Sequence, residues 1–166
     1  SGTSLDQILR VIIPHGWFLP VTPGTSRITL GGAISSDVHG KNHHLHGAFG
    51  QHVLDLRLLT PTGRVLVCSR HENPEIFAAV CGGMGLLGLI LSARISLMPL
   101  ESVFIRQQTI PAADLDQLME LFDSHHQSTY TVAWMDCLQS GRHLGRGLFM
   151  HGEHCRSGQA PHSKLI

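Results

Sequence analysis

The chain has 166 residues, and its 12 Lys and Arg residues balance 12 Asp and Glu residues, so the formal net charge is zero. This length is enough for one domain or one and a half. The neutral charge gives no reason to expect a surface for nucleic acid or anionic membranes. No apolar run is long enough to span a bilayer.

The first residues, SGTSLDQIL, have neither the positive region nor the apolar region of a signal peptide. They also lack an initiator Met, which suggests a piece cut from a longer protein. The 4 cysteines are widely spaced and form no CxxC pair, so neither a zinc ribbon nor a dense disulfide framework is indicated. We therefore expect reduced thiols and a cytoplasmic setting.

Histidine is unusually abundant, with 13 residues. His39, His43, His44 and His46 lie together, so a histidine-rich metal-binding module without catalysis is one alternative. Zinc sites use four ligands with recognisable spacing, and the HHLH run has no partner cluster that supplies such a frame. We assign no metal ligand.

The first element is expected to be a short helix. Thr3 or Ser4 can cap it, and its apolar residues recur at helical spacing. Pro14 and Gly16 are expected to end it. A short strand over residues 17–21 then leads into a glycine-rich stretch.

Residues 23–44, PGTSRITLGGAISSDVHGKNHH, have a composition that a packing strand does not need. Gly31 and Gly32 lack a Cβ, so the backbone can approach another surface closely or take a positive φ. Free N–H groups in turn-like concavities bind anions, so a ligand with phosphates or a flat ring is a natural occupant. A glycine-rich loop between strands is the alternative.

Residues 42–51 are expected to form a loop, followed by a hairpin of residues 53–59 and 64–68 around Pro61 and Gly63. Alternation would place Leu54, Leu56 and Leu58 on one face. We interpret this hairpin as scaffold.

A helix is expected to start at Asn73-Pro74-Glu75 and to stop at Gly82-Gly83. A second glycine cluster, GGMGLLG, precedes an apolar strand over residues 89–97, which we expect to be covered on both faces.

The pattern changes after a boundary at residues 99–102. Residues 114–123 predict an amphipathic helix with Leu115, Leu118, Met119 and Phe122 on one face. Residues 130–134 alternate as a strand, and residues 144–150 predict another. The last stretch, residues 155–166, is polar and is expected to be a frayed tail.

The stretch PGTSRITLGGAISSDVHGKNHHLHGAFG resembles the FAD-binding domain of the vanillyl-alcohol oxidase / p-cresol methylhydroxylase superfamily, most of all its decaprenylphosphoryl-β-D-ribose 2-oxidase branch. The resemblance continues through HVLDLRLLTPTG, NPEIFAAVCGGMGLLGLIL and YTVAWMDCL. It implies an α+β chain: residues 1–99 as the second half of the FAD-binding domain, and residues 100–166 as the start of a truncated substrate domain.

The resemblance also implies an FAD-dependent oxidoreductase that oxidises a CH–OH group of a sugar-like substrate by hydride transfer to flavin. An aldonolactone oxidase of the same superfamily is an alternative. The substrate would be a small molecule or a lipid-linked sugar, the second of which would place the protein near a membrane. The family's first glycine-rich loop and its general base are expected outside these residues, so we do not expect the chain alone to be catalytic.

Carried over residue by residue, the resemblance implies catalytic roles for His39 and Lys41, which match positions that face the flavin ring and the substrate. The implied FAD-contacting residues, mostly through backbone, are Gly24, Thr29, Leu30, Gly31, Gly32, Ser36, Asp37, Val38, His39 and Ile90.

Overall fold

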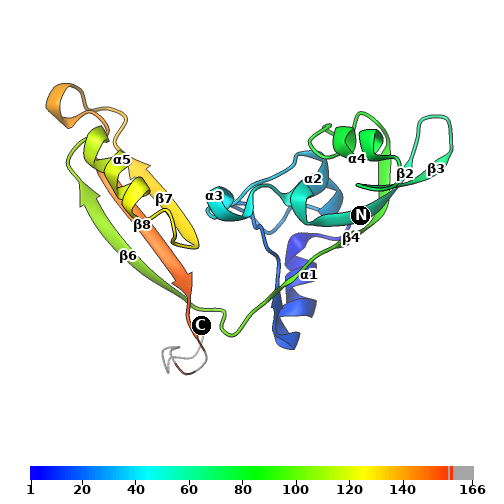
Figure 1. Ribbon diagram of the computed structural model, residues 1–166, viewed down its shortest axis with the longest axis horizontal. Helices are drawn as coiled ribbons and strands as arrows, with labels where there is room; N and C mark the ends of the chain where they lie inside the picture. Colours follow the sequence, from blue (N-terminus) through cyan, green and yellow to red (C-terminus); the bar gives the residue numbers. More distant parts are fainter. Residues whose placement is uncertain (157, 159–166) are drawn as a thin grey trace. The chain divides into compact units, whose positions relative to one another are not determined.

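The computed structural model describes residues 1–156 and 158, and the chain forms two compact units, Ser1–Pro99 and Leu100–Ile166 (Figure 1). Each unit combines helices with antiparallel strands. Within the described residues, no helix has the length and apolar character needed to cross a membrane.

The first helix, α1 (Leu5–Ile12), forms where it was predicted. Ser4 is its cap: Ser4 Oγ accepts a hydrogen bond from Gln7 N at 3.2 Å, and Ser4 N donates to Gln7 Oε1 at 2.9 Å. A 3-10 turn, η1 (Ile13–His15), continues it to Gly16, which has a φ of 76°. The strand that follows, β1 (Trp17–Phe18), is shorter than predicted and pairs with β5 (Met98–Pro99).

The glycine-rich stretch and the predicted loop after it contain helical turns that sequence patterns did not predict. These turns are α2 (Leu30–Ser35), α3 (His43–His46) and η2 (Phe49–His52), and η2 extends one residue beyond the segment predicted as a loop. Glycine has poor helix propensity, so Gly31 and Gly32 argue locally against α2. Burial of Ala33 and Ile34, both 0 % exposed, compensates for that cost.

The predicted hairpin is present as β2 (Val53–Leu59) and β3 (Val65–Ser69), with β4 (Leu89–Ile95) on the other side of β2 (Figure 1). All pairs are antiparallel. Leu56 and Leu58 are buried as predicted, but Leu54 is 49 % exposed. The register shifts between Val53 and Asp55, so Leu54 is the extra residue of a β-bulge and turns away from the core.

The second predicted helix is α4 (Pro74–Val80). Asn73 precedes it with a φ of 49°, but its Nδ2 donates to Val67 O at 2.7 Å and its side chain does not cap the helix. Gly82, at a φ of 85°, lies just beyond the end of α4.

Strand β4 is covered on one face only, contrary to the prediction. Ile90 is 4 % exposed, whereas its neighbours Leu89 and Leu91 are 61 % and 36 % exposed. A strand that begins with three apolar residues can therefore still alternate in burial.

One hydrophobic core holds the first unit together. It joins α1, α2, η2, α4, the sheet and the segment after β1. Its buried side chains are Leu5, Leu19, Val21, Leu30, Ala33, Ile34, Phe49, Val53, Leu56, Leu58, Cys68, Phe77, Val80 and Ile90.

The second unit is a three-stranded antiparallel sheet in the order β6-β8-β7, with α5 (Leu115–Ser124) across one face (Figure 1). The strands are β6 (Ile105–Ala112), β7 (Tyr130–Met135) and β8 (Gly147–His154), with a 3-10 turn η3 (Gly141–His143) between β7 and β8. Ala112, Leu118 and Phe149 form its core.

Two sequence expectations for this unit need correction. The apolar stripe of α5 is narrower than predicted, because Leu115 and Met119 are 40 % and 57 % exposed. The last strand begins at Gly147 and not at residue 144. Of the predicted tail, residues 157 and 159–166 lie outside the described residues.

His151 occupies an unusual place at the edge of the second core. Its ring stacks on Phe149 at 5.9 Å and lies 4.4 Å from the His125 ring at the end of α5. Its Nδ1 is 3.1 Å from Ser128 Oγ, while its Nε2 is buried without a hydrogen-bond partner among the described residues. Burial, and then the neighbouring His125, lower the pKa of His151, although Glu153 opposes them.

This environment predicts acid sensitivity of the second unit. Because the folded-state pKa of His151 lies below its ordinary value of 6.5, the unfolded chain binds the proton more readily. The folded second unit is therefore most stable above pH 6.5, where His151 is neutral in both states, and it loses stability as the pH falls below that value. Hydrogen exchange of β8, corrected for intrinsic rates, should show less protection at about pH 5.5 than at about pH 7.5. His151→Gln should reduce this pH dependence; an unchanged dependence would contradict the assignment.

Candidate functional site

The exposed face of α2 is made of backbone and small side chains. Thr29, Gly32 and Ser36 are exposed, and their i, i+3, i+7 spacing places them on one face of the helix. Leu30 and Ile34 face the core. Thr29 Oγ1 accepts a hydrogen bond from Gly32 N at 3.1 Å, which holds the threonine side chain down on the first turn. A flat group can therefore approach this face closely.

The two adjacent glycines of α2 have different roles. A Cβ at Gly31 would lie 2.8 Å from Ser1 Oγ, so Gly31 is needed for the close approach of residue 1. Ser1 Oγ in turn donates to Ile90 O, and this bond brings Ile90 next to α2. A Cβ at Gly32 would meet only Thr29 Oγ1 within 4 Å, at 3.2 Å, so the space outside Gly32 is open.

The first N–H groups of α2 already have acceptors within the chain. They are Leu30 N to Thr3 O at 2.8 Å, Gly31 N to Ser1 O at 3.0 Å, Gly32 N to Thr29 Oγ1 at 3.1 Å and Ala33 N to Thr29 O at 2.8 Å. The free N–H groups expected for anion binding are therefore not found at the start of this helix. The face suits a ring or a sugar better than a diphosphate.

The segment after α2 is held against residues 48–50 by three contacts. They are Asp37 Oδ1 with Gly50 N at 2.7 Å, Val38 O with Phe49 N at 2.9 Å, and an isolated antiparallel bridge between His39 and Ala48. Asp37 has a φ of 41°, a left-handed conformation that short polar residues tolerate. Its Oδ1 is thus used within the fold, as is its backbone N–H, which donates to Ile34 O at 3.0 Å.

The second glycine cluster lies directly on α2. Gly82 N donates to Ile34 O at 3.1 Å, and Met84 N donates to Ser35 O at 2.8 Å. These bonds satisfy carbonyl groups near the end of a short helix. Sequence analysis identified both glycine clusters, but the patterns contained no signal that they meet.

Arg70 supports the same region and was missed by sequence analysis. Its guanidinium donates to the carbonyl oxygens of Gly50, Gln51 and Val53 at 3.2, 2.9 and 2.9 Å. It also lies 5.5 Å from the centre of the Phe77 ring. An exposed arginine after a strand has no sequence signature that distinguishes this role from a solvated charge.

Cys81 lies close to Asp37 but is not a reactive thiol. Burial raises the pKa of Cys81 to about 11, and the negative charge of Asp37 adds to this effect, while Arg70 opposes it. The thiol is therefore protonated at neutral pH, and a thiolate is the form required of a nucleophile or metal ligand.

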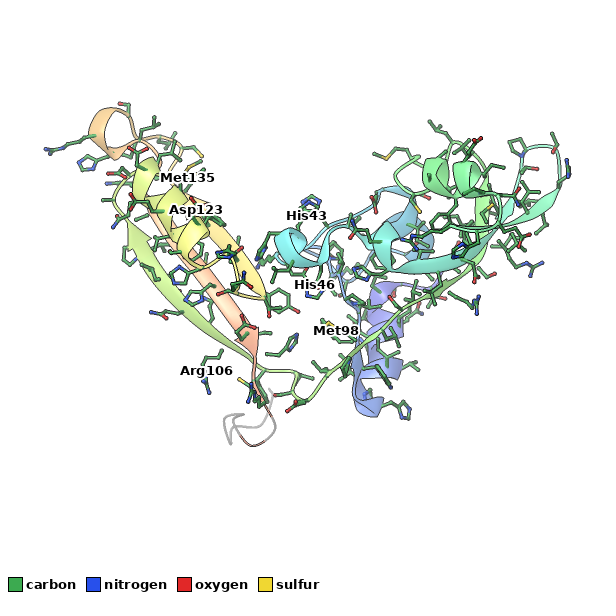
Figure 2. The ribbon with its side chains drawn as sticks, viewed as in Figure 1. His43, His46, Met98, Arg106, Asp123 and Met135 are labelled. Atoms are coloured by element: carbon green, nitrogen blue, oxygen red, sulfur yellow. The ribbon has the colours of Figure 1, made fainter. Side chains whose placement is uncertain are left out.

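The histidines that the structure describes do not gather into a metal site. His43 and His46 point to opposite sides of α3 (Figure 2). The His43 ring lies 5.2 Å from the His39 ring, and the His46 ring lies 6.4 Å from that of His52. Among residues 1–156 and 158, no group of three or more His, Cys, Asp or Glu side chains could hold a metal ion. This geometry gives no support to the metal-binding alternative.

The sequence-selected residues divide into three groups by exposure. Exposed are Gly24, Thr29, Gly32, Ser36, His39 and Lys41; partly buried are Gly31, Asp37 and Val38; buried are Leu30 and Ile90. The contacts above join α2, the segment of residues 37–39 and Ile90 in one region. For Gly24, an added Cβ would meet no atom within 4 Å.

Comparisons with known proteins indicate the kind of domain that these residues form. Residues 1–69 match the family described as the FAD binding domain. The chain is 39 % identical over 172 residues to the decaprenylphosphoryl-beta-D-ribose oxidase of Mycolicibacterium smegmatis, covering 99 % of the chain and 36 % of that protein. It is 40 % identical over 152 residues to an uncharacterized protein of Streptomyces coelicolor, covering 91 % of the chain and 41 % of that protein.

A third relative is the L-gulonolactone oxidase of Bos taurus, 34 % identical over 125 residues, which cover 75 % of the chain and 28 % of that protein. The chain thus spans less than half the length of each of these relatives. Residues 1–69 thus match an FAD-binding domain, and FAD is the cofactor that this match indicates.

Proposed function

We propose that the full-length protein oxidises a CH–OH group of a lipid-linked sugar, as the name of the mycobacterial relative suggests for that enzyme. In this proposal, residues 1–99 are the second half of the FAD-binding domain, and residues 100–166 begin the substrate domain. The observation that supports it most is the 39 % identity that extends over 99 % of the chain, through both units.

The exposed face of α2 fits a part of FAD. Gly32 leaves open space, and Thr29 and Ser36 offer hydroxyl groups that can donate to or accept from ring and ribose oxygens. Because the first N–H groups of α2 are already used, we assign the diphosphate to other residues of the full-length protein. We propose backbone or van der Waals contacts for Gly24, Leu30, Gly31, Asp37, Val38 and Ile90. Bound FAD would supply a hydride acceptor.

His39 and Lys41 are the proposed catalytic side chains. Both are exposed, and both come shortly after α2 in the sequence. A histidine can donate to a substrate oxygen or accept its proton. The Lys41 ammonium is a compact positive charge that would attract the phosphate of a lipid-linked sugar.

An aldonolactone is the second candidate substrate, because the bovine relative is named L-gulonolactone oxidase and matches 75 % of the chain. The test is anaerobic mixing of the full-length, FAD-loaded protein with each candidate, followed by the loss of flavin absorbance. We expect a polyprenylphosphoryl-β-D-ribose to reduce the flavin and L-gulonolactone not to do so. Reduction by the lactone alone would reverse the assignment, and reduction by neither would refute both.

Substitution of Gly32 should remove the cofactor. In Gly32→Val, the added methyl groups would enter the open space outside α2, so the purified full-length protein should retain less than about a tenth of its FAD. Bound FAD is measured by its absorbance against protein concentration, with circular dichroism as a check of folding. Gly2→Val is the matched control, because a Cβ there meets nothing within 4 Å. Full FAD content in a folded Gly32→Val protein would exclude α2 from the site.

Replacement of His39 should affect the reaction more than the fold. His39 is exposed, so His39→Ala removes little packing. The loss of a hydrogen-bond donor to a reacting oxygen should slow flavin reduction by ~10²–10³-fold. Bound FAD and the unfolding temperature should change little. Unchanged reduction kinetics in rapid-mixing experiments would show that His39 does not contact the substrate.

A further inference from the structure

Asn42 is the one buried polar side chain among the described residues, at 1 % exposure. Its neighbours Lys41 and His43 are exposed. Burial of an amide is costly unless its polar atoms are paired. Asn42 Nδ2 donates to Pro20 O at 2.7 Å, but Oδ1 has no hydrogen-bond partner in the part of the chain that the structure describes. The Nδ2 donor is therefore the part of the amide that links Asn42 to the rest of the fold.

Asn42 does not play the usual role of an asparagine before a helix. It is the N-cap residue of α3, yet its side chain makes no capping hydrogen bond. Its backbone oxygen instead accepts from Leu45 N at 3.1 Å and His46 N at 2.8 Å. Asn42 thus fixes the start of α3 through its backbone, while its side chain holds the chain at Pro20.

Gly40 makes a second contact with the same segment. A Cβ at Gly40 would lie 2.5 Å from Thr22 O and 3.0 Å from Asn42 Oδ1. Its φ is outside the left-handed range, so glycine is required here for close approach and not for backbone conformation. Gly40 and Asn42 therefore both contact the segment of residues 20–22.

These two contacts leave little freedom to the residues beside them. Lys41 lies between the two fixed positions, and His39 directly precedes them. On its other side, His39 is held by its bridge to Ala48. In this loop, the exposed residues His39 and Lys41 thus alternate with the partly buried Gly40 and the buried Asn42.

We propose that Asn42 is a positioning residue for His39 and Lys41. Its amide donor holds the loop of residues 39–42 on Pro20, so that the two exposed side chains are presented in one arrangement. Asn42 itself touches neither cofactor nor substrate. This inference rests on the proposed function of His39 and Lys41. A displacement of about 1 Å at a reacting group is enough to slow catalysis ~10²-fold.

The test uses full-length, FAD-loaded protein and the variants Asn42→Leu and Asn42→Asp. Leucine has a similar shape but leaves Pro20 O without its donor. Hydrogen exchange of residues 37–47 should become at least ~10-fold faster, while that of β2 should stay unchanged, because only the loop is released. Flavin reduction by the polyprenylphosphoryl-ribose should slow ~10–100-fold, with bound FAD nearly unchanged.

The aspartate variant adds a readout that depends on the donor itself. A buried carboxyl group has a raised pKa, and its protonated form has an O–H that can donate to Pro20 O. Loop protection in Asn42→Asp should therefore be partly restored as the pH is lowered, whereas in Asn42→Leu it should not. Equal pH behaviour of the two variants would overturn the role assigned to the donor.

A second pair of variants keeps the test decisive if Asn42→Leu does not fold. Gly40→Ala should release the same loop, because its Cβ would meet Thr22 O at 2.5 Å, whereas Gly2→Ala should not. Exchange that rises equally in β2 and in the loop would make Asn42 an ordinary core residue and overturn the proposal. Failure of every substrate to reduce wild-type flavin would refute the proposed function, while hydrogen exchange would still decide whether Asn42 fixes the loop.

Discussion

The candidate site depends on the pairing of residues 37–39 with residues 48–50. This short pairing closes a loop that contains α3, and the Asp37 carboxylate strengthens it by accepting from Gly50 N at 2.7 Å. Arg70 holds the carbonyl oxygen of the same Gly50. Gly50 is thus fixed at both its N–H and its C=O. The position of His39 depends on this arrangement, because His39 pairs with Ala48 in the same segment.

Local signals were enough to predict the scaffold. A cap at Thr3 or Ser4 with apolar residues at helical spacing predicts α1, and the Pro61 and Gly63 turn predicts the hairpin of β2 and β3, because each signal lies within a few residues of its effect. The prediction was wrong at Leu54, where a β-bulge relative to β4 shifts the face, and β4 is far away in the sequence. Helix α2 was missed because its glycines oppose a helix that tertiary burial stabilises.

The side chains proposed as catalytic, His39 and Lys41, could be named from the sequence through the family resemblance, but the residues that support their loop could not. Both side chains are exposed in the structure. The site is supported by hydrogen bonds of Ser1, Pro20 and Arg70 to residues 20 or more positions away in the sequence. Nothing in the local sequence of these residues indicates such bonds. Asn42 belonged to the recognised run, yet only its burial separates it from the exposed residues on either side.

Adjacent residues in this stretch have different structural roles, so its composition alone does not show which residues build the loop and which are exposed on it. The missing side chain of Gly31 makes room for Ser1 between α2 and Ile90. The missing side chain of Gly32 instead leaves open space outside α2. Lys41 is exposed and Asn42 is buried for the same geometric reason, since neighbouring residues at the start of a helix point in different directions. A run such as LGGAISSDVHGKN therefore combines residues that build the loop with residues that the loop presents. The building residues are the ones whose substitution should loosen the loop, and the presented ones are those whose substitution should alter binding or reaction within an intact loop.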